Sequence, residues 1–147
     1  MANKGPAHSA VFVHTNVFVR LLTNDPPAQA KAAERALDAA GEGNIVAVLT
    51  DIIFAELAYV LTEVYELGRA DAADRLQRIL DLPGLHVSDE EFLRGALELW
   101  KTSRLDFADA HLAALAVRIK DAAVLSFDKD FDRLDGVTRL DPTQVGV

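Results

Sequence analysis

The stretch AVFVHTNVFVRLL, residues 10–22, determines how the rest of the chain is interpreted. It begins with the apolar, β-branched run of a buried strand, and the polar triplet HTN at 14–16 follows where that run stops. Residues 16–22 then predict a short helix, which ends at the turn formed by NDPP at 24–27. The chain therefore opens with a strand and a helix that have polar side chains at their junction.

Apolar runs of strand length alternate with segments of helical periodicity along the remaining sequence. This alternation is typical of βαβ units, in which parallel strands are covered by helices on both faces. We therefore predict an α/β fold of three layers with a mostly parallel sheet of four or five strands, formed by residues 1–147 as a single domain. The predicted strands are 10–13, 45–49, 85–87 and 123–127, and the helices after the first are 28–40, 51–67, 70–82, 89–102 and 107–120.

The composition restricts the classes of function. The absence of cysteine excludes disulfides, thiolate metal sites and thiol nucleophiles, and it favours a reducing compartment. The first ten residues lack a signal-peptide pattern, and no apolar run reaches the roughly 18 residues of a membrane span, so we expect a cytoplasmic protein. The net charge of −8 opposes binding to nucleic acid unless positive charge is concentrated locally or supplied by metal ions.

Glu56 borders the apolar stripe of its predicted helix, three residues after Ile53 and four before Val60. A carboxylate near a core edge is costly unless it is paired or bound to a metal. The alternative is a boundary glutamate whose stem packs while its carboxylate reaches solvent. Helical geometry alone favours that alternative.

Asp106 and Asp109 open the helix in LDFADAHLAA, residues 105–114. Capping explains Asp106 fully, because an N-cap aspartate accepts a hydrogen bond from a backbone amide of the first turn. Asp109 shares a face with Leu112 and Ala113, so capping and a functional role are equally compatible with its position.

Asp128 directly follows the apolar run at 123–127. In open α/β sheets ligands bind at the carboxyl ends of strands, which makes this aspartate a candidate site residue. An aspartate-rich turn is the alternative, and Asp130 fits that alternative better than Asp128 does.

Four motifs, in this order and with compatible spacing, resemble the PIN-domain ribonucleases and among them the VapC-type toxins of toxin–antitoxin pairs. The resemblance covers nearly the whole chain. The motifs are FVHTNVFVRLLTNDPP at 12–27, TDIIFAEL at 50–57, LDFADAHLAA at 105–114 and LSFDKDFDRLDGV at 125–137.

The resemblance implies an acidic site that binds one or two Mg²⁺ or Mn²⁺ ions and hydrolyses RNA phosphodiester bonds. It also implies a homodimer that is inhibited by a cognate antitoxin protein. Asp109 and Asp128 become the principal metal ligands, Glu56 ligates the metal or positions the attacking water, and Asn16 holds the end of the first strand. The remaining members of the implied site are His14 at the first acidic position, Thr15 beside it, and Asp106 and Asp130 as secondary carboxylates.

His14 departs from the family pattern, which has an aspartate at this position. Histidine removes one negative charge and two hard oxygens, and its imidazole suits Mn²⁺, Zn²⁺ or Fe²⁺ better than Mg²⁺. Three explanations fit: a substitution that disarms a toxic nuclease, a natural protein that binds without cleaving, or an active enzyme with a different metal preference. The intact remainder of the acidic set favours the first, so we expect weak cleavage or none.

Two other classes of function remain open from sequence. One is a catalytically inactive PIN-like module that binds an antitoxin or RNA. The other is an acidic-pocket phosphotransfer protein in which Asp128 or Asp51 accepts phosphate, although this leaves Asp109 and Glu56 unexplained. For RNA cleavage, Arg20, Lys101 and Arg104 are the candidates to line the approach of the phosphate backbone.

Overall fold

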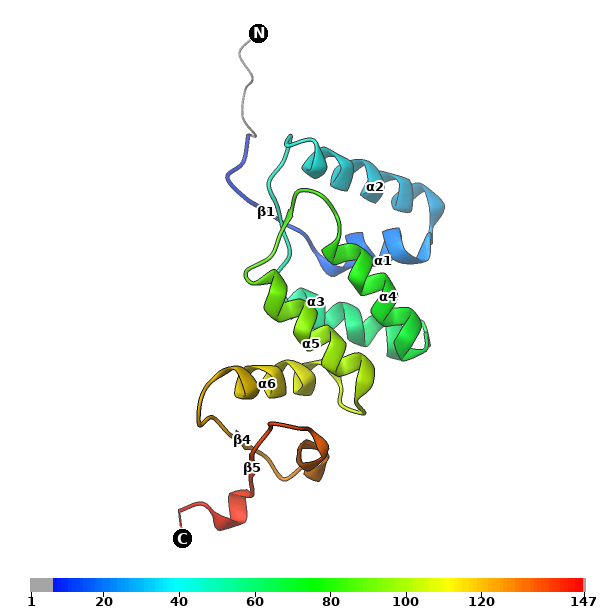
Figure 1. The fold of residues 1–147 in the computed structure, drawn as a ribbon. Coiled ribbons are helices and arrows are strands. Elements are labelled where there is room, and N and C mark those ends of the chain that lie inside the picture. The colour runs from blue at the N-terminus through cyan, green and yellow to red at the C-terminus, as the bar shows by residue number, and fades with distance from the viewer. Residues whose placement is uncertain (1–6, 147) are drawn as a thin grey trace. The chain divides into compact units, whose positions relative to one another are not determined.

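A computed structural model describes residues 7–146 as α-helices and short parallel strands (Figure 1). The chain divides into two compact units, Met1–Glu90 and Glu91–Val147, and each unit is described by itself. No helix among the described residues is both long and apolar enough to cross a membrane.

The N-terminal unit is built on a parallel sheet in the order β1-β2-β3. In its register Val11 of β1 lies opposite Ala47 of β2, and Ala47 lies opposite Leu85 of β3. The elements of this unit are β1 (Val11–Phe12), α1 (Thr15–Thr23), α2 (Pro27–Gly41), β2 (Ala47–Val48), α3 (Asp51–Tyr59), the π-helix η1 (Val60–Val64), α4 (Arg69–Leu80) and β3 (Leu85–His86).

Capping and turn residues set the helix ends of the N-terminal unit. Thr50 is the N-cap of α3 and its hydroxyl accepts a hydrogen bond from the Ile53 amide at 3.4 Å. Asn24 ends α1 in the left-handed conformation. Gly84, with φ of +76°, lies so close to the backbone of Ala40 that a side chain would collide with it, which explains the glycine before β3.

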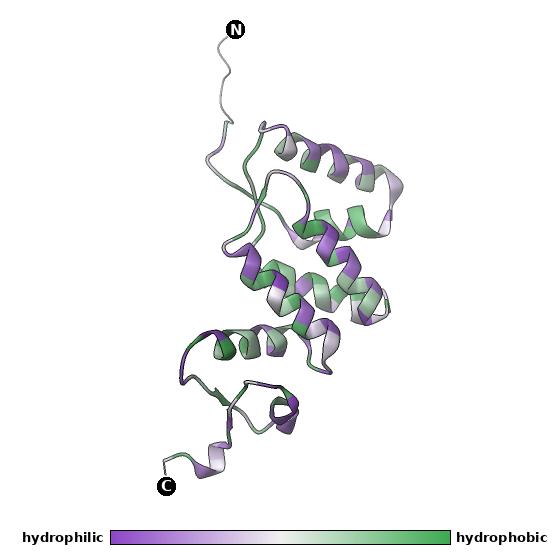
Figure 2. Ribbon diagram, in the orientation of Figure 1, coloured by the Kyte–Doolittle hydropathy of each residue, from purple (hydrophilic) through white to green (hydrophobic). Residues whose placement is uncertain are grey.

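The core of the N-terminal unit consists of apolar side chains from its helices and from β2. Burial of these side chains supplies the main favourable term for folding. The helix α2 carries a hydrophobic and a hydrophilic side (Figure 2), as expected for a helix that covers a core. The side chains of this core with no exposed surface include Phe18, Phe54, Leu57, Leu61 and Leu76.

The C-terminal unit contains two main helices and a second pair of parallel strands. Val124 of β4 lies opposite Arg139 of β5, and the edge of the Trp100 ring packs against Phe107 with 6.1 Å between ring centroids. The elements are α5 (Glu90–Thr102), α6 (Phe107–Arg118), β4 (Val124–Leu125), the 3₁₀ helix η2 (Lys129–Arg133), β5 (Arg139–Leu140) and the 3₁₀ helix η3 (Pro142–Gln144).

The α/β class and the parallel direction of the strands are confirmed. The strands form one sheet of three and one of two, whereas the sequence predicted one sheet of four or five. Each strand contains only two residues, so very few hydrogen bonds decide which strands form a sheet. The predicted helix at 51–67 also differs, because it continues beyond α3 as the π-helix η1.

Candidate active site

His14 lies at the carboxyl end of β1 and is the N-cap residue of α1. Its backbone is extended, with φ of −79° and ψ of 154°, and its Nδ1 atom accepts a hydrogen bond from the Asn16 amide at 3.2 Å. This is the contact that an N-cap aspartate makes through a carboxylate oxygen. His14 therefore retains the capping function of the expected acid.

Capping leaves the imidazole of His14 without a lone pair for a metal ion. A neutral imidazole carries one N–H and one acceptor nitrogen, and Nδ1 of His14 is the acceptor that caps α1. While this contact is made, the neutral imidazole carries its proton on Nε2 and has no free lone pair for a cation. A carboxylate has two oxygens with spare lone pairs, so an aspartate could cap the helix and bind a metal at the same time.

Glu56 of α3 is oriented by a hydrogen bond from α1. The Thr15 hydroxyl donates to Glu56 Oε2 at 2.5 Å, across 41 residues of sequence. Thr15 is only 4% exposed and is the one buried polar residue among residues 7–146. Hydrogen bonds to charged groups are stronger than those between neutral groups, so this contact both fixes the carboxylate and joins the two helices.

A cavity of about 330 Å³ in the N-terminal unit is lined by both polar and apolar residues. Its lining includes His14, Asn16 and Glu56 together with Val60 and Tyr65. Val60 belongs to the π-helix η1, whose irregular turn places Tyr65 directly after it. Single π-turns inside helices occur often at functional sites.

In the C-terminal unit, two aspartates begin short elements by capping them. Asp106 is the N-cap of α6 and accepts a hydrogen bond from the Asp109 amide at 2.9 Å, which confirms the capping prediction. Asp128 follows β4 and is the N-cap of η2, where its carboxylate accepts from the Asp130 amide at 2.8 Å. Both contacts leave further oxygen lone pairs on each carboxylate.

Asp109 lies in a field of like charges. Partial burial raises the pKa of its carboxyl, and the charge and hydrogen bonding of Asp106 and the charge of Asp128 raise it further. The carboxylates of α6 and of the β4–η2 turn therefore act on one another.

Arg139 acts on several acids of this unit, Asp128 among them. Arg139 has a side chain only 11% exposed and binds Asp132 through two hydrogen bonds of 3.0 Å. Hydrogen bonding from Arg139 holds the pKa of Asp132 below its usual range. Asp130 lies 3.9 Å from Arg133, which supports the turn interpretation of this residue.

The predicted site residues thus fall into two groups. His14, Asn16 and Glu56 lie around one cavity of the N-terminal unit, and the secondary residues Asp106 and Asp130 accompany Asp109 and Asp128 in the C-terminal unit. Within residues 7–146, no three histidine, aspartate or glutamate side chains are spaced to enclose a metal ion. The donor chemistry of the second group nevertheless fits a hard divalent cation, because it is made of oxygen atoms whose charges repel.

The fold is α/β, with Asp128 following the parallel strand β4 and with Asp106 and Asp109 at the start of α6. Comparison with protein families identifies the PIN domain over residues 11–137, which is most of the chain. The chain belongs to the PIN domain family, whose members are generally metal-dependent nucleases. A search of curated proteins found no match.

Sequence reasoning missed the role of Thr15 and the capping contact of His14. Thr15 was placed beside the acidic position, but its partner Glu56 is 41 residues away and the pairing has no local signal. The histidine contact could have been found, because the residue between a strand and a helix is the ordinary position of an N-cap.

Proposed function

We propose that this chain is the scaffold of an endoribonuclease that uses Mg²⁺ or Mn²⁺, and the toxin of a VapC-type toxin–antitoxin pair. The observation that carries the proposal is the raised pKa of the Asp109 carboxyl, caused by partial burial and by the neighbouring acids Asp106 and Asp128, in a chain that belongs to the PIN domain family. Unbalanced carboxylates in a folded protein are often functional, because they destabilise the fold unless a ligand neutralises them.

Asp109 and Asp128 are the residues proposed to hold the cation, with Asp106 and Asp130 beside them. Such a cation supplies two effects when bound: it activates water and it neutralises charge on a phosphate. Asp106 and Asp128 are restrained by their capping contacts, so their carboxylates are oriented before any ligand binds.

Glu56 is proposed as a further ligand or as the group that orients the attacking water. The hydrogen bond from Thr15 supports this role, because it fixes one carboxylate oxygen and leaves the other available. Asn16 is proposed to hold the end of β1, where its backbone N–H already donates to His14 Nδ1.

His14 is proposed to weaken this site. Its one acceptor nitrogen caps α1, so it cannot also take the place of the missing carboxylate as a ligand. Loss of a metal ligand or of its orienting partner commonly lowers affinity or activity 10- to 100-fold, roughly. This argument favours a disarmed nuclease over an active enzyme with a different metal preference.

The remaining features are proposals that rest on the family. The substrate is RNA, and the protein partners are a cognate antitoxin and a second copy of the chain in a cytoplasmic homodimer. Three basic residues were suggested to line the approach of the RNA backbone. Arg20 donates a hydrogen bond from its Nε to the Gln29 side chain at 2.8 Å. Lys101 lies in the last turn of α5, and Arg104 follows that helix.

Restoring the first acidic residue tests the proposal. RNA cleavage in Mg²⁺ and in Mn²⁺ is compared between the chain and the His14→Asp variant, and we expect cleavage to increase at least about 10-fold. The variant Asn44→Asp serves as a control that adds the same charge at an exposed position of the same unit, outside the candidate site. If His14→Asp gains nothing over the parent chain in either metal, the disarmed-site proposal is wrong.

A catalytically inactive PIN-like module is the second candidate, and the capping contact of His14 favours it. Such a module would keep the fold and bind an antitoxin or RNA. Calorimetry separates the two candidates, because the inactive module should bind no divalent metal even after His14→Asp.

A further inference from the structure

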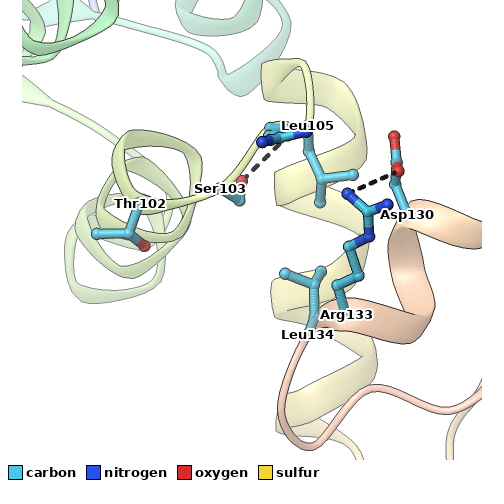
Figure 3. A pocket seen from close by; sticks show the side chains of 7 residues that line it. Thr102, Ser103, Leu105, Asp130, Arg133 and Leu134 are labelled. Carbon is cyan, nitrogen blue, oxygen red and sulfur yellow. Dashed lines mark hydrogen bonds and ion pairs between the residues drawn. The ribbon is translucent and has the colours of Figure 1, made fainter.

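A second cavity, of about 240 Å³, lies entirely within the C-terminal unit (Figure 3). It is formed where the turn between α5 and α6 faces the helix η2. Its polar lining comes from the hydroxyl residues Thr102 and Ser103, the arginines Arg104 and Arg133, and the acidic residue Asp130. Leu105 and Leu134 close the floor with apolar atoms.

The guanidinium groups retain most of their hydrogen-bonding capacity. Among the described residues no carboxylate pairs with Arg104, which is exposed to solvent. Arg133 meets one oxygen of Asp130 at 3.9 Å, a distance at the limit of an ion pair (Figure 3). Each guanidinium has five N–H donors in a planar arrangement that matches phosphate oxygens.

The position of the cavity relates it to the acidic residues of the same unit. Leu105 immediately precedes Asp106, and Asp130 donates its amide to Asp128. Both walls of the cavity are therefore continuous with the segments that carry Asp106 and Asp128. A phosphate held in the cavity would belong to a nucleotide close to these carboxylates along a bound strand.

We propose that Arg104 and Arg133 form a phosphate-binding subsite for the RNA backbone in the cavity between the α5–α6 turn and η2. This inference rests on the proposed nuclease function and names how the substrate is held. It also bears on the objection that a chain of net charge −8 repels nucleic acid, because the two arginines outnumber the one acid, Asp130, on this concave surface.

The test measures RNA binding without hydrolysis. A fluorescently labelled single-stranded RNA is titrated in EDTA at a series of KCl concentrations, and binding is followed by anisotropy. The double variant Arg104→Gln, Arg133→Gln should bind about 10-fold more weakly. Loss of one neutralised phosphate should also reduce the slope of log K against log salt by about 0.7.

Two further variants separate the subsite from a general charge effect. Lys31→Gln with Arg35→Gln makes the same charge change on exposed positions of α2 and should leave the affinity and the salt slope unchanged. Asp130→Asn removes the acid that faces Arg133 and should strengthen binding. A damaged fold cannot explain a gain in affinity, and thermal melting of each variant confirms that it remains folded.

The outcomes distinguish this inference from the proposed function. If the arginine double variant binds RNA as the parent does, or no more weakly than the α2 double variant, the subsite is refuted while cleavage by His14→Asp still tests the nuclease. If His14→Asp fails to cleave but RNA binding depends on the two arginines, the subsite stands and the nuclease proposal falls. Binding of an acidic peptide in place of RNA would refute the assignment to RNA.

Discussion

In the N-terminal unit the carboxylate of Glu56 accepts a hydrogen bond from the buried hydroxyl of Thr15, whereas in the C-terminal unit the carboxylate of Asp109 lies beside two other acids. In the first arrangement the carboxylate has a hydrogen-bond donor from the same unit. In the second, partial burial and the neighbouring acids Asp106 and Asp128 raise the pKa of the Asp109 carboxyl. The two carboxylates belong to the same set of family motifs and differ in the neighbours that the fold gives them.

This difference indicates that the acidic residues of the C-terminal unit, and not Glu56, depend on a ligand. A carboxylate with its own hydrogen-bond donor needs no cation to be stable, but a group of repelling carboxylates is stabilised when a cation binds. His14 belongs to the N-terminal unit, where it caps α1. We therefore expect substitutions in the two units to differ in whether their effects depend on metal.

Removal of the central acid should have the largest effect. In the His14→Asp background, Asp109→Asn is expected to lower RNA cleavage about 100-fold or more, because it removes a group proposed to hold the catalytic charge. Cleavage rates in Mn²⁺ measure this directly. The exposed Asp135→Asn of the same unit is the control, and cleavage that survives Asp109→Asn would show that the acidic set has been assigned wrongly.

The same substitution should have the opposite effect on stability. The folded-state pKa of Asp109 lies above its unfolded value, so its ionised form costs stability at neutral pH, and this cost disappears as the pH falls through the ordinary aspartate range. In EDTA, Asp109→Asn should raise Tm at neutral pH and have little effect in acid. A lower Tm at neutral pH would mean that the carboxylate is already compensated within the protein.

In the N-terminal unit we expect a loss of stability that does not depend on metal. Thr15→Val keeps the shape of a buried residue but removes the donor to Glu56, which should cost about 1 kcal/mol of unfolding free energy. Thr62→Val is the matched control, because the Thr62 hydroxyl bonds only to backbone carbonyls of its own helix. Urea denaturation of both variants, with and without Mn²⁺, measures the difference. Equal losses for the two variants would remove the special role of the Thr15–Glu56 contact.

The smallest effect is expected at Asp132. Its pKa is lowered chiefly by the hydrogen bond with Arg139, so this contact stabilises the fold above the ordinary aspartate pKa and is lost as the pH falls through the lowered value. Asp132 is half exposed, which weakens the contact by solvent screening. Asp132→Asn should lower Tm slightly at neutral pH and not in strong acid, as followed by thermal melting across that range.

Local patterns predict most of the fold. Apolar periodicity and capping residues locate all six α-helices, and Thr50 and Asp106 cap the helices that they were expected to begin. The strand β5 was not predicted, because one of its two residues is Arg139, whose charge is balanced by Asp132 seven residues earlier. The π-helix η1 was also missed, since it depends on the Tyr65 amide bonding to Val60, a choice that apolar spacing does not reveal.

The candidate site was predicted in its residues and not in its contacts. The position of Asp109 in the first turn of a predicted helix and that of Asp128 after a predicted strand were enough to select these two acids. The partner of Glu56 and the tautomer required of His14 depend on side chains that meet only in the folded chain. Long-range pairing of this kind has no periodicity, so a single sequence cannot supply it.

The most direct test of the central claim is a titration with Mn²⁺, followed by calorimetry, of the chain and its Asp109→Asn variant. The account predicts that the parent chain binds Mn²⁺ and that Asp109→Asn weakens this binding about 10- to 100-fold, while Asp135→Asn leaves it unchanged. Binding of Mn²⁺ by Asp109→Asn with the affinity of the parent would contradict the claim that the repelling carboxylates of the C-terminal unit form the cation site.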